Sequence, residues 1–270
     1  MTNLSDYFDK GNFYDTSDAN IVVGDLAVGK IGYGSTGRLE GVYDPGMMAF
    51  DGASGYYDKT YTSAGNLLTA VVRFTAPSVS GGSAHWVMAS TGPSSNARLS
   101  LQIPDNDFAT AASRGKLEVV VKNSAGANVC KLGSSTTVTD GAEYVVFFAY
   151  DGDNGTSLFY INGADEDDVG YTGRVLTTGT LYTGASSTLY VGALPSVYLA
   201  ATVGYCGMRD AYLTNPTDFY HPTNGLQELD ESGWTEWGAQ PLFWNQYGTM
   251  SDNKGSGGNM TANGTITGPA

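Results

Sequence analysis

Apolar side chains alternate with polar ones along several short stretches of the chain. The apolar positions that share one face are Leu68, Ala70, Val72 and Phe74 in the first stretch, Leu99, Leu101 and Ile103 in the second, and Leu117, Val119 and Val121 in the third. A period of two puts alternate side chains on opposite faces of a strand, so these stretches predict half-buried strands. They recur with turn residues between them, a pattern typical of an antiparallel β-sandwich.

A denser apolar run, Tyr144–Tyr150, leads into the turn sequence Asp151–Gly155. A second β-rich run, Leu158–Ile161, follows and ends at Asn162-Gly163. Asp, Asn and Gly tolerate the backbone conformations that tight turns need, so the pattern predicts a β-hairpin.

The composition favours an all-β chain, and the length limits the number of domains. The chain has 270 residues, of which 41% are hydrophobic and 15% charged, with 37 Gly and 18 Tyr. This length accommodates one large β-domain with extensions, and the low charge does not favour long charged helices. The two cysteines, Cys130 and Cys206, are too few for a disulfide framework. We expect two free, half-buried thiols, with a single bridge between them as the alternative.

Net charge excludes some partners. The formal charge is −14, so the chain lacks the basic surface that binds phosphate backbones, and we expect no nucleic-acid partner and no membrane partner. The N-terminus has no basic segment followed by an apolar core, and no apolar run reaches the roughly 20 residues of a membrane span. Synthesis in a reducing cytoplasm is therefore expected.

Catalytic and metal-binding patterns are weak. The chain contains no pair of Glu residues flanking an Asp on one strand, and the acidic run 165–168 is typical of a solvated turn. We interpret His85 and His221 as structural residues, and the sequence contains no nucleophile-elbow motif. We expect no catalytic residues, no cofactor and no metal site. Asp165 and Asp167 are the weak candidates for a calcium ion.

Several of these segments together resemble laminin G-like, concanavalin A-like jelly-roll domains. The segments are the hairpin around Asp151, Phe50-Asp51-Gly52 with the aromatic pair Tyr56-Tyr57, Leu189-Tyr190-Val191-Gly192, and Gly204–Thr214. The resemblance covers about residues 47–214. It implies an all-β jelly-roll sandwich at 46–214, with an N-terminal docking arm at 1–45 and a C-terminal wrapping tail at 215–270.

Residues 20–41 and 253–268 are similar to elements of bacteriophage virion proteins. In the first, Asp25-Leu26-Ala27-Val28-Gly29-Lys30 leads to a tight hairpin around Gly34–Gly37. This unit is too small to be stable alone, so it either docks on a partner or forms a simple linker hairpin. The candidate capsid-attachment residues are Phe8, Phe13, Tyr14, Ile21, Leu26 and Ile31.

The resemblance implies a non-enzymatic virion structural protein, a capsid decoration (cement) protein first, with the sandwich displayed outward. A tail or fibre adhesion module that binds host-surface carbohydrate is the alternative, and a glycan hydrolase is disfavoured by the missing acid pair. The implied partners are the major capsid protein or another virion protein, and a host or environmental glycan. A homotrimer is also implied, with a monomer spread along capsomer edges as the alternative. The implied location is the virion surface, after synthesis in the host cytoplasm.

Three tryptophans in the tail, Trp234, Trp237 and Trp244, have two interpretations. Flat aromatic rings stack on the C–H faces of sugars, which would make these residues a glycan-binding site. Buried aromatics also dominate core packing, and a tail that wraps the sandwich would use them for that purpose.

Overall fold

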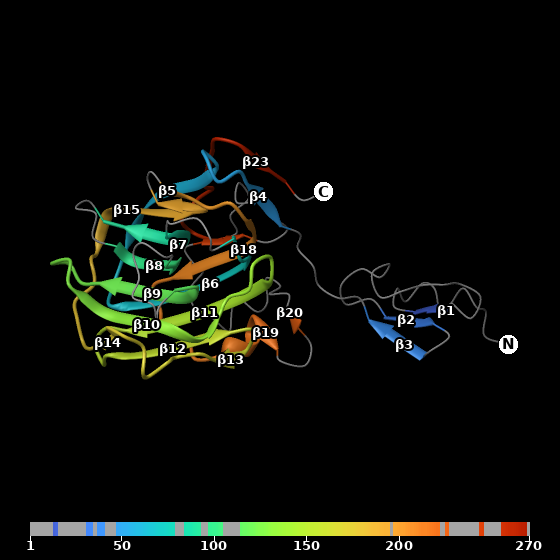
Figure 1. Ribbon diagram of the computed structural model, residues 1–270, viewed down its shortest axis with the longest axis horizontal. Coiled ribbons are helices and arrows are strands. Elements are labelled where there is room, and N and C mark those ends of the chain that lie inside the picture. Colours follow the sequence, from blue (N-terminus) through green and yellow to red (C-terminus); the bar gives the residue numbers. More distant parts are fainter. Residues whose placement is uncertain are drawn as a thin grey trace. The chain divides into compact units, whose positions relative to one another are not determined.

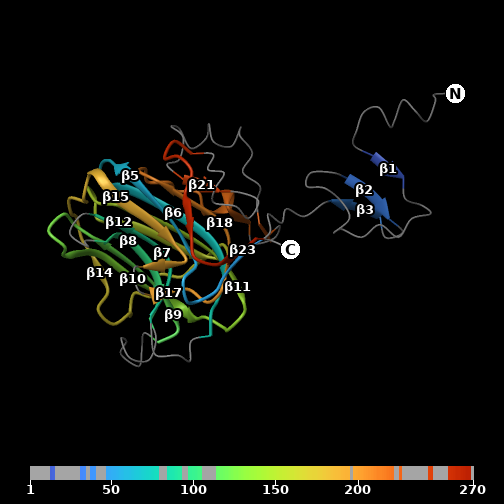
Figure 2. The same ribbon diagram turned by 90° about the horizontal axis from the view of Figure 1, so that it is seen from above.

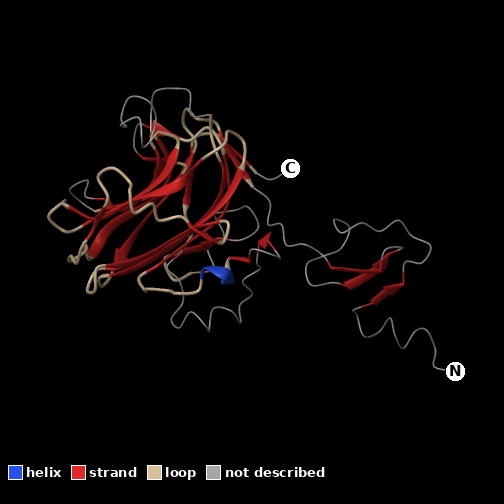
Figure 3. Cartoon of the chain, turned by 60° about the horizontal axis from the view of Figure 1, so that its bottom comes forward, coloured by secondary structure: helices blue, strands red, loops and turns tan. Residues whose placement is uncertain are grey.

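The computed structural model describes residues 13–15, 31–34, 37–40, 47–78, 84–92, 97–104, 114–194, 197–221, 225–226, 243–245 and 255–268. The chain divides into two compact units, Met1–Asp44 with Leu226–Glu228, and Pro45–Gly225 with Leu229–Ala270. The described elements are almost all strands, with one short 3-10 helix (Figure 3). Within them no helix is long and apolar enough to cross a bilayer.

The small unit contains a three-stranded sheet of β1 (Phe13–Asp15), β2 (Ile31–Gly34) and β3 (Gly37–Glu40). β1 runs parallel to β2, and β2 pairs with β3 in the antiparallel direction. Gly34 lies opposite Gly37, so the hairpin predicted at this point is present.

The large unit is built on two large antiparallel sheets (Figure 1). Sheet I has the order β14 (Val175–Leu176), β10 (Asn128–Thr137), β9 (Lys116–Lys122), β8 (Ala97–Ile103), β7 (His85–Thr91), β15 (Gly184–Val191), β5 (Tyr56–Ser63) and β22 (Thr261–Asn263). Sheet II has the order β13 (Ala164–Asp165), β12 (Thr156–Ile161), β11 (Glu143–Asp151), β6 (Leu67–Thr75), β18 (Thr202–Arg209), β4 (Met48–Phe50) and β23 (Ile266–Thr267), and β21 (Phe243–Asn245) also pairs with β18. The predicted jelly-roll, concanavalin A-like sandwich is therefore confirmed.

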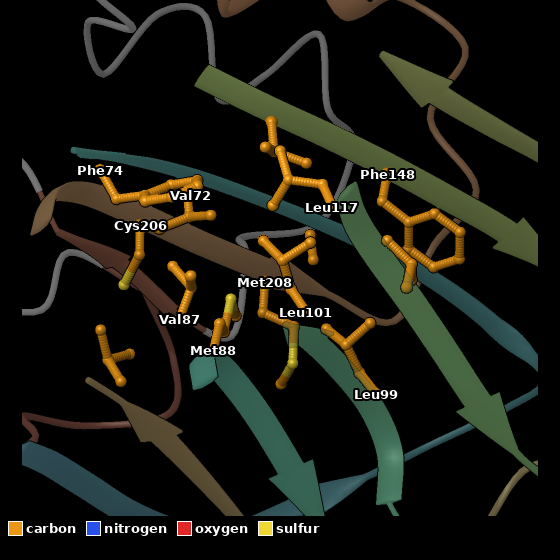
Figure 4. Close-up of a cluster of buried hydrophobic side chains, with 14 of the residues drawn as sticks. Val72, Phe74, Val87, Met88, Leu99, Leu101, Leu117, Phe148, Cys206 and Met208 are labelled. Atoms are coloured by element: carbon orange, nitrogen blue, oxygen red, sulfur yellow. The ribbon is translucent and has the colours of Figure 1, made fainter. Parts of the chain in front are cut away.

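The core lies between the two sheets. Figure 4 shows side chains of sheet II, among them Val72, Phe148 and Met208, packed against Leu101 and Leu117 of sheet I. All the apolar positions predicted to share strand faces belong to this one cluster. The two thiols are free, as expected, but they are fully buried in the same core rather than half-buried, because each lies on a strand face that packs between the sheets. Burial raises the pKa of the Cys130 thiol.

The predicted hairpin is formed by β11 and β12. Asp151 lies opposite Thr156 across the turn, and the Asp151 carboxylate accepts hydrogen bonds from the backbone N–H groups of Asp153 and Asn154 at 2.9 and 3.0 Å. Every side chain from Tyr144 to Tyr150 is buried. Such a continuous apolar run occurs when both faces of a strand are covered.

The outer face of sheet II is covered by the segment that follows β18. Its short helix η2 (Pro216–Asp218) leads to Phe219, whose ring lies 5.4 Å from that of Phe147. The Tyr205 hydroxyl donates to the Phe219 carbonyl at 3.2 Å. Thr69 fastens the start of the segment, because its hydroxyl donates to the Ala211 carbonyl at 2.7 Å.

The C-terminal segment adds one strand to each sheet. Figure 2 labels the second of these strands, β23. β22 pairs with β5 in sheet I, and β23 pairs with β4 in sheet II. Gly264 makes the turn between them at a φ of 64°, and the Thr265 N–H donates to Ser54 Oγ at 3.2 Å. A short hairpin of β16 (Ala193–Leu194) and β17 (Val197–Tyr198) completes the sandwich. β19 (Tyr220–His221) and β20 (Gly225–Leu226) form a further two-stranded sheet.

Candidate functional site

The outer face of sheet I carries a group of tyrosine and polar side chains on β5, β15 and β22. Along β5, Tyr57 and Tyr61 belong to the core, so the alternating residues Tyr56, Asp58 and Thr60 lie on the opposite face. The neighbouring strand obeys the same rule, because Leu189 and Val191 belong to the core and Thr188 and Tyr190 alternate with them. Pairing then brings Tyr190 opposite Asp58 and Thr188 opposite Thr60.

Three partly exposed tyrosine rings lie next to one another on this face. The Tyr56 and Tyr190 ring centroids are 6.1 Å apart with an interplanar angle of 43°. The ring centroid of Tyr198, from β17, lies 6.0 Å from that of Tyr56, with an interplanar angle of 40°. We call Tyr56, Tyr190 and Tyr198, together with Asp58 and Asn263, the tyrosine face.

Asp58 and Asn263 supply the polar part of the tyrosine face. Asn263 Nδ2 donates to Asp58 Oδ1 at 2.9 Å and to the Thr261 carbonyl at 3.2 Å. Within the described residues, Asp58 Oδ2 and Asn263 Oδ1 receive no hydrogen bond, so each is an acceptor available to a ligand. Asn263 stands on β22, so the C-terminal segment completes the face.

The Tyr190 ring is uncharged near neutral pH, because its pKa is raised above the already high value of an ordinary phenol. Burial raises the pKa of Tyr190, and the charges of Asp58 and Tyr56 raise it further. Near neutral pH the Tyr190 phenol therefore remains a neutral hydroxyl, which can donate as well as accept a hydrogen bond.

The tyrosine face was not predicted, and Trp244, the one predicted tryptophan within the described residues, is on a strand of the other sheet. Trp234 and Trp237 lie outside the described residues. Trp244 lies on β21, where it pairs with Gly207 of β18, and β21 belongs to sheet II rather than sheet I. The structure describes its backbone only.

The candidate attachment residues fall in the small unit. Phe8, Ile21 and Leu26 lie outside the described residues. Phe13 and Tyr14 are on β1 and Ile31 is on β2, with Phe13 directly opposite Ile31 in the pairing. For these three residues the structure describes the backbone only, so the attachment role stays a prediction.

The weak calcium candidates are engaged in other interactions. Asp167 forms an ion pair with Arg174, in which Arg174 Nη2 lies 2.6 Å from Oδ2 and Nε lies 3.1 Å from Oδ1. Asp165 is exposed, and its Oδ1 accepts the Asp167 N–H at 3.2 Å. Among the residues that the structure describes, no group of three potential metal ligands is present.

The other two residues of the acidic run, Glu166 and Asp168, attach their loop to sheet I through hydrogen bonds and an ion pair. Glu166 accepts hydrogen bonds from the Ser135 hydroxyl and from both the N–H and the hydroxyl of Thr136, the last two at 2.9 Å. Lys116 Nζ lies 2.8 Å from Asp168 Oδ2, and this hydrogen bond is the main cause of a lowered Asp168 pKa. The run is therefore a structural attachment, and two of its carboxylates are ion-paired.

Glu118 is a buried acid that the alternating pattern did not reveal. Its side chain is on the outer face of β9, yet the residue is only 4% exposed, because Tyr171 covers it. Gln102 Nε2 lies 2.5 Å from one carboxylate oxygen, while the Tyr171 hydroxyl at 2.7 Å and Lys131 Nζ at 3.0 Å contact the other. Gly133 leaves space for the Tyr171 ring, since a Cβ there would lie 2.1 Å from it.

A second buried charge, Arg98, holds one end of the sandwich together. Its Nη2 donates to the carbonyls of Ala64 and Gly65 at 3.1 Å and lies 3.0 Å from Asp210 Oδ1. Burial raises the Asp210 pKa, and Arg98 opposes that shift. Because Arg98 comes from sheet I and Asp210 follows the last strand residue of β18 in sheet II, the pair joins the two sheets.

Comparisons with known proteins establish the fold. No protein-family model matches the sequence, and no curated protein matches it. The heptameric SAP-like pentraxin of Limulus polyphemus is similar in structure, with a TM-score of 0.57, 12% identity, and coverage of 85% of this chain and 98% of that chain. A Bacteroides ovatus protein that is proposed to bind carbohydrate gives a TM-score of 0.54 and 14% identity over 91% of this chain and 71% of that chain.

A more distant likeness is to the enzymatically active domain of tailspike protein 2 of bacteriophage CBA120. Its TM-score is 0.43 at 14% identity, and the match covers 66% of this chain and 27% of that chain. A likeness at that level does not bear on function. The similar structures establish that this chain has a concanavalin A-like β-sandwich of the kind found in pentraxins.

Proposed function

We propose that this protein is a non-enzymatic bacteriophage virion component whose sandwich binds glycans through the tyrosine face. The observation that carries glycan binding is the group of three adjacent, partly exposed rings beside Asp58 and Asn263. Aromatic rings pack on the apolar faces of sugars, and carboxylate and amide oxygens accept hydrogen bonds from sugar hydroxyls. The likeness to a Bacteroides protein proposed to bind carbohydrate supports the same function.

The acids present at the face support binding without hydrolysis. Glycosidases generally place two carboxyl groups about 5–10 Å apart across the sugar. On the strands that form the face, β5, β15, β17 and β22, Asp58 is the one carboxylate residue. We expect no products from common β-glucans, alginates or lipopolysaccharide fragments.

The virion setting rests on the resemblance of residues 20–41 and 253–268 to phage virion proteins, and on the separate small unit. That unit, Met1–Asp44 with Leu226–Glu228, is compact and distinct from the sandwich. It is the attachment device in this proposal, with the major capsid protein or another virion protein as partner and the virion surface as location. Capsid decoration is the first assignment, and a tail or fibre position is the second.

A glycan array tests the binding function. The wild-type chain should bind a subset of glycans, and Tyr56→Ala and Tyr190→Ala should each weaken that binding about tenfold or more, equivalent to about 1.4 kcal/mol. Tyr160→Ala is the matched control, because Tyr160 is also partly exposed but lies on β12 in sheet II. Binding that survives both face substitutions, in proteins with wild-type melting temperatures, would refute the site.

A further inference from the structure

We infer that the tyrosine face selects neutral and amine-bearing glycans over acidic ones, with Asp58 as the residue that determines this preference. The inference rests on the proposed glycan-binding function and adds the chemical class of the ligand. It follows from the charges near the three rings and from how the Asp58 carboxylate is held.

Asp58 supplies the charge of the described face. β15, β17 and β22 contain no charged residue, and β5 contains two, Asp58 and Lys59. Lys59 alternates with Asp58 and so lies on the opposite side of the strand, where its Nζ would be 3.3 Å from a Cβ on Gly258. An acidic sugar at the face would therefore lie near the negative charge of Asp58. None of these four strands places a basic residue on the same face to offset that charge.

The carboxylate is held in place before any ligand arrives. Asn263 fixes Oδ1 at 2.9 Å, which leaves Oδ2 as the acceptor that the described residues do not occupy. Its charge acts close to the rings, because Asp58 contributes to the raised pKa of Tyr190. A second negative charge about 4 Å away is disfavoured by about fivefold even at the dielectric constant of water, and an ammonium group is favoured to a similar degree.

Asp58 also has a purely structural interpretation, in which it only anchors β22 through Asn263. That interpretation predicts no dependence of glycan choice on the Asp58 charge. The two interpretations are therefore separated by measuring relative binding of glycans that differ in charge, rather than by measuring stability.

The experiment uses the full-length chain on an array that holds neutral, amine-bearing and acidic glycans. It is supplemented with β-1,4-linked oligomers of glucose, glucosamine and glucuronic acid of equal length. Only binding that is lost in Tyr190→Ala is counted. We expect such binding among neutral and amine-bearing glycans, with acidic ones at least about fivefold weaker. In Asp58→Asn, which keeps an oxygen for Asn263, the ratio of amine-bearing to acidic binding should fall toward one.

Thr60→Lys provides a second variant that leaves Asp58 intact. Thr60 is exposed and on the same side of β5 as Asp58, so a lysine there should raise acidic binding relative to neutral binding. Two outcomes would overturn the inference and leave the proposed function standing. One is tyrosine-dependent binding of acidic glycans that is as strong as that of neutral glycans. The other is an unchanged ratio of amine-bearing to acidic binding in Asp58→Asn. No tyrosine-dependent binding in any class would overturn the proposed function and the inference with it.

Discussion

Phe147 and Phe148 are neighbours in the sequence but lie on opposite faces of β11. Both are only 2% exposed, because Phe148 packs in the core between the sheets and Phe147 packs beneath Phe219. Replacing either by Asp would bury an unpaired carboxylate, and we expect the free energy of unfolding to fall by about 3–5 kcal/mol in each variant. Urea unfolding followed by circular dichroism measures this change.

Thr62→Asp is the control for these substitutions, since Thr62 is an exposed strand residue on β5. It should unfold at nearly the wild-type urea concentration. Wild-type midpoints for both Phe variants would contradict the finding that β11 is covered on its two faces.

Alternation in the sequence was sufficient to assign the core residues but not the functional face. The period of two identified Leu101 and Val119 as core because that information is local. It could not bring Tyr190 next to Tyr56, since their contact depends on the pairing of β15 with β5, far apart in the chain. Glu118 was missed for a similar reason, because the Tyr171 loop that buries it is distant in sequence.

Short strands form the edges of both large sheets. β14, β13 and β23 have two residues each, and β22 has three. Short edge strands expose few unpaired backbone groups, which limits pairing between different molecules. The β11–β12 hairpin was predictable because its turn residues are local, whereas the addition of β22 to β5 depends on a contact between opposite ends of the chain.

The substitution Gly264→Ala tests whether the C-terminal strands stabilise the sandwich and support the tyrosine face. Its φ is 64°, and a Cβ there would lie 2.2 Å from the Ser54 carbonyl oxygen, so Gly264→Ala should force the β22–β23 turn away from the sandwich. We expect a loss of roughly 1–3 kcal/mol in stability and weaker glycan binding, since Asn263 precedes this turn. Thermal melts and amide hydrogen exchange at residues 261–263 measure the two effects.

Gly268→Ala is the matched control, because a Cβ at Gly268 would meet nothing within 4 Å. It should resemble the wild type in melting temperature, hydrogen exchange and binding. Equal behaviour of the two alanine variants would show that the turn does not support the tyrosine face.

The chain as a whole combines a small unit, a sandwich and a net charge of −14. Deletion of residues 1–45 should leave a folded, soluble sandwich that binds glycans but no longer joins the particle. Quantitative mass spectrometry of purified virions, complemented with full-length or truncated protein, gives the copy number. Full occupancy by the truncated protein would refute attachment through this unit.

Self-association is a separate property of the whole chain. Like-charged sandwiches repel, so we place the contacts of the proposed homotrimer in residues 1–45. Light scattering should give a trimer mass for the full-length chain and a monomer mass after the deletion. A full-length chain that stays monomeric at high concentration would exclude the trimer without affecting the fold.

The most direct test of the tyrosine face is an amide and indole NMR titration of the full-length chain with the strongest glycan from the array. We predict that the largest chemical-shift changes fall on Tyr56, Asp58, Tyr190, Tyr198 and Asn263, while the indole signals of Trp234, Trp237 and Trp244 stay unchanged. Changes confined to the tryptophan indoles, with the amides of β5, β15 and β22 unaffected, would contradict this account and move the glycan site to the tail.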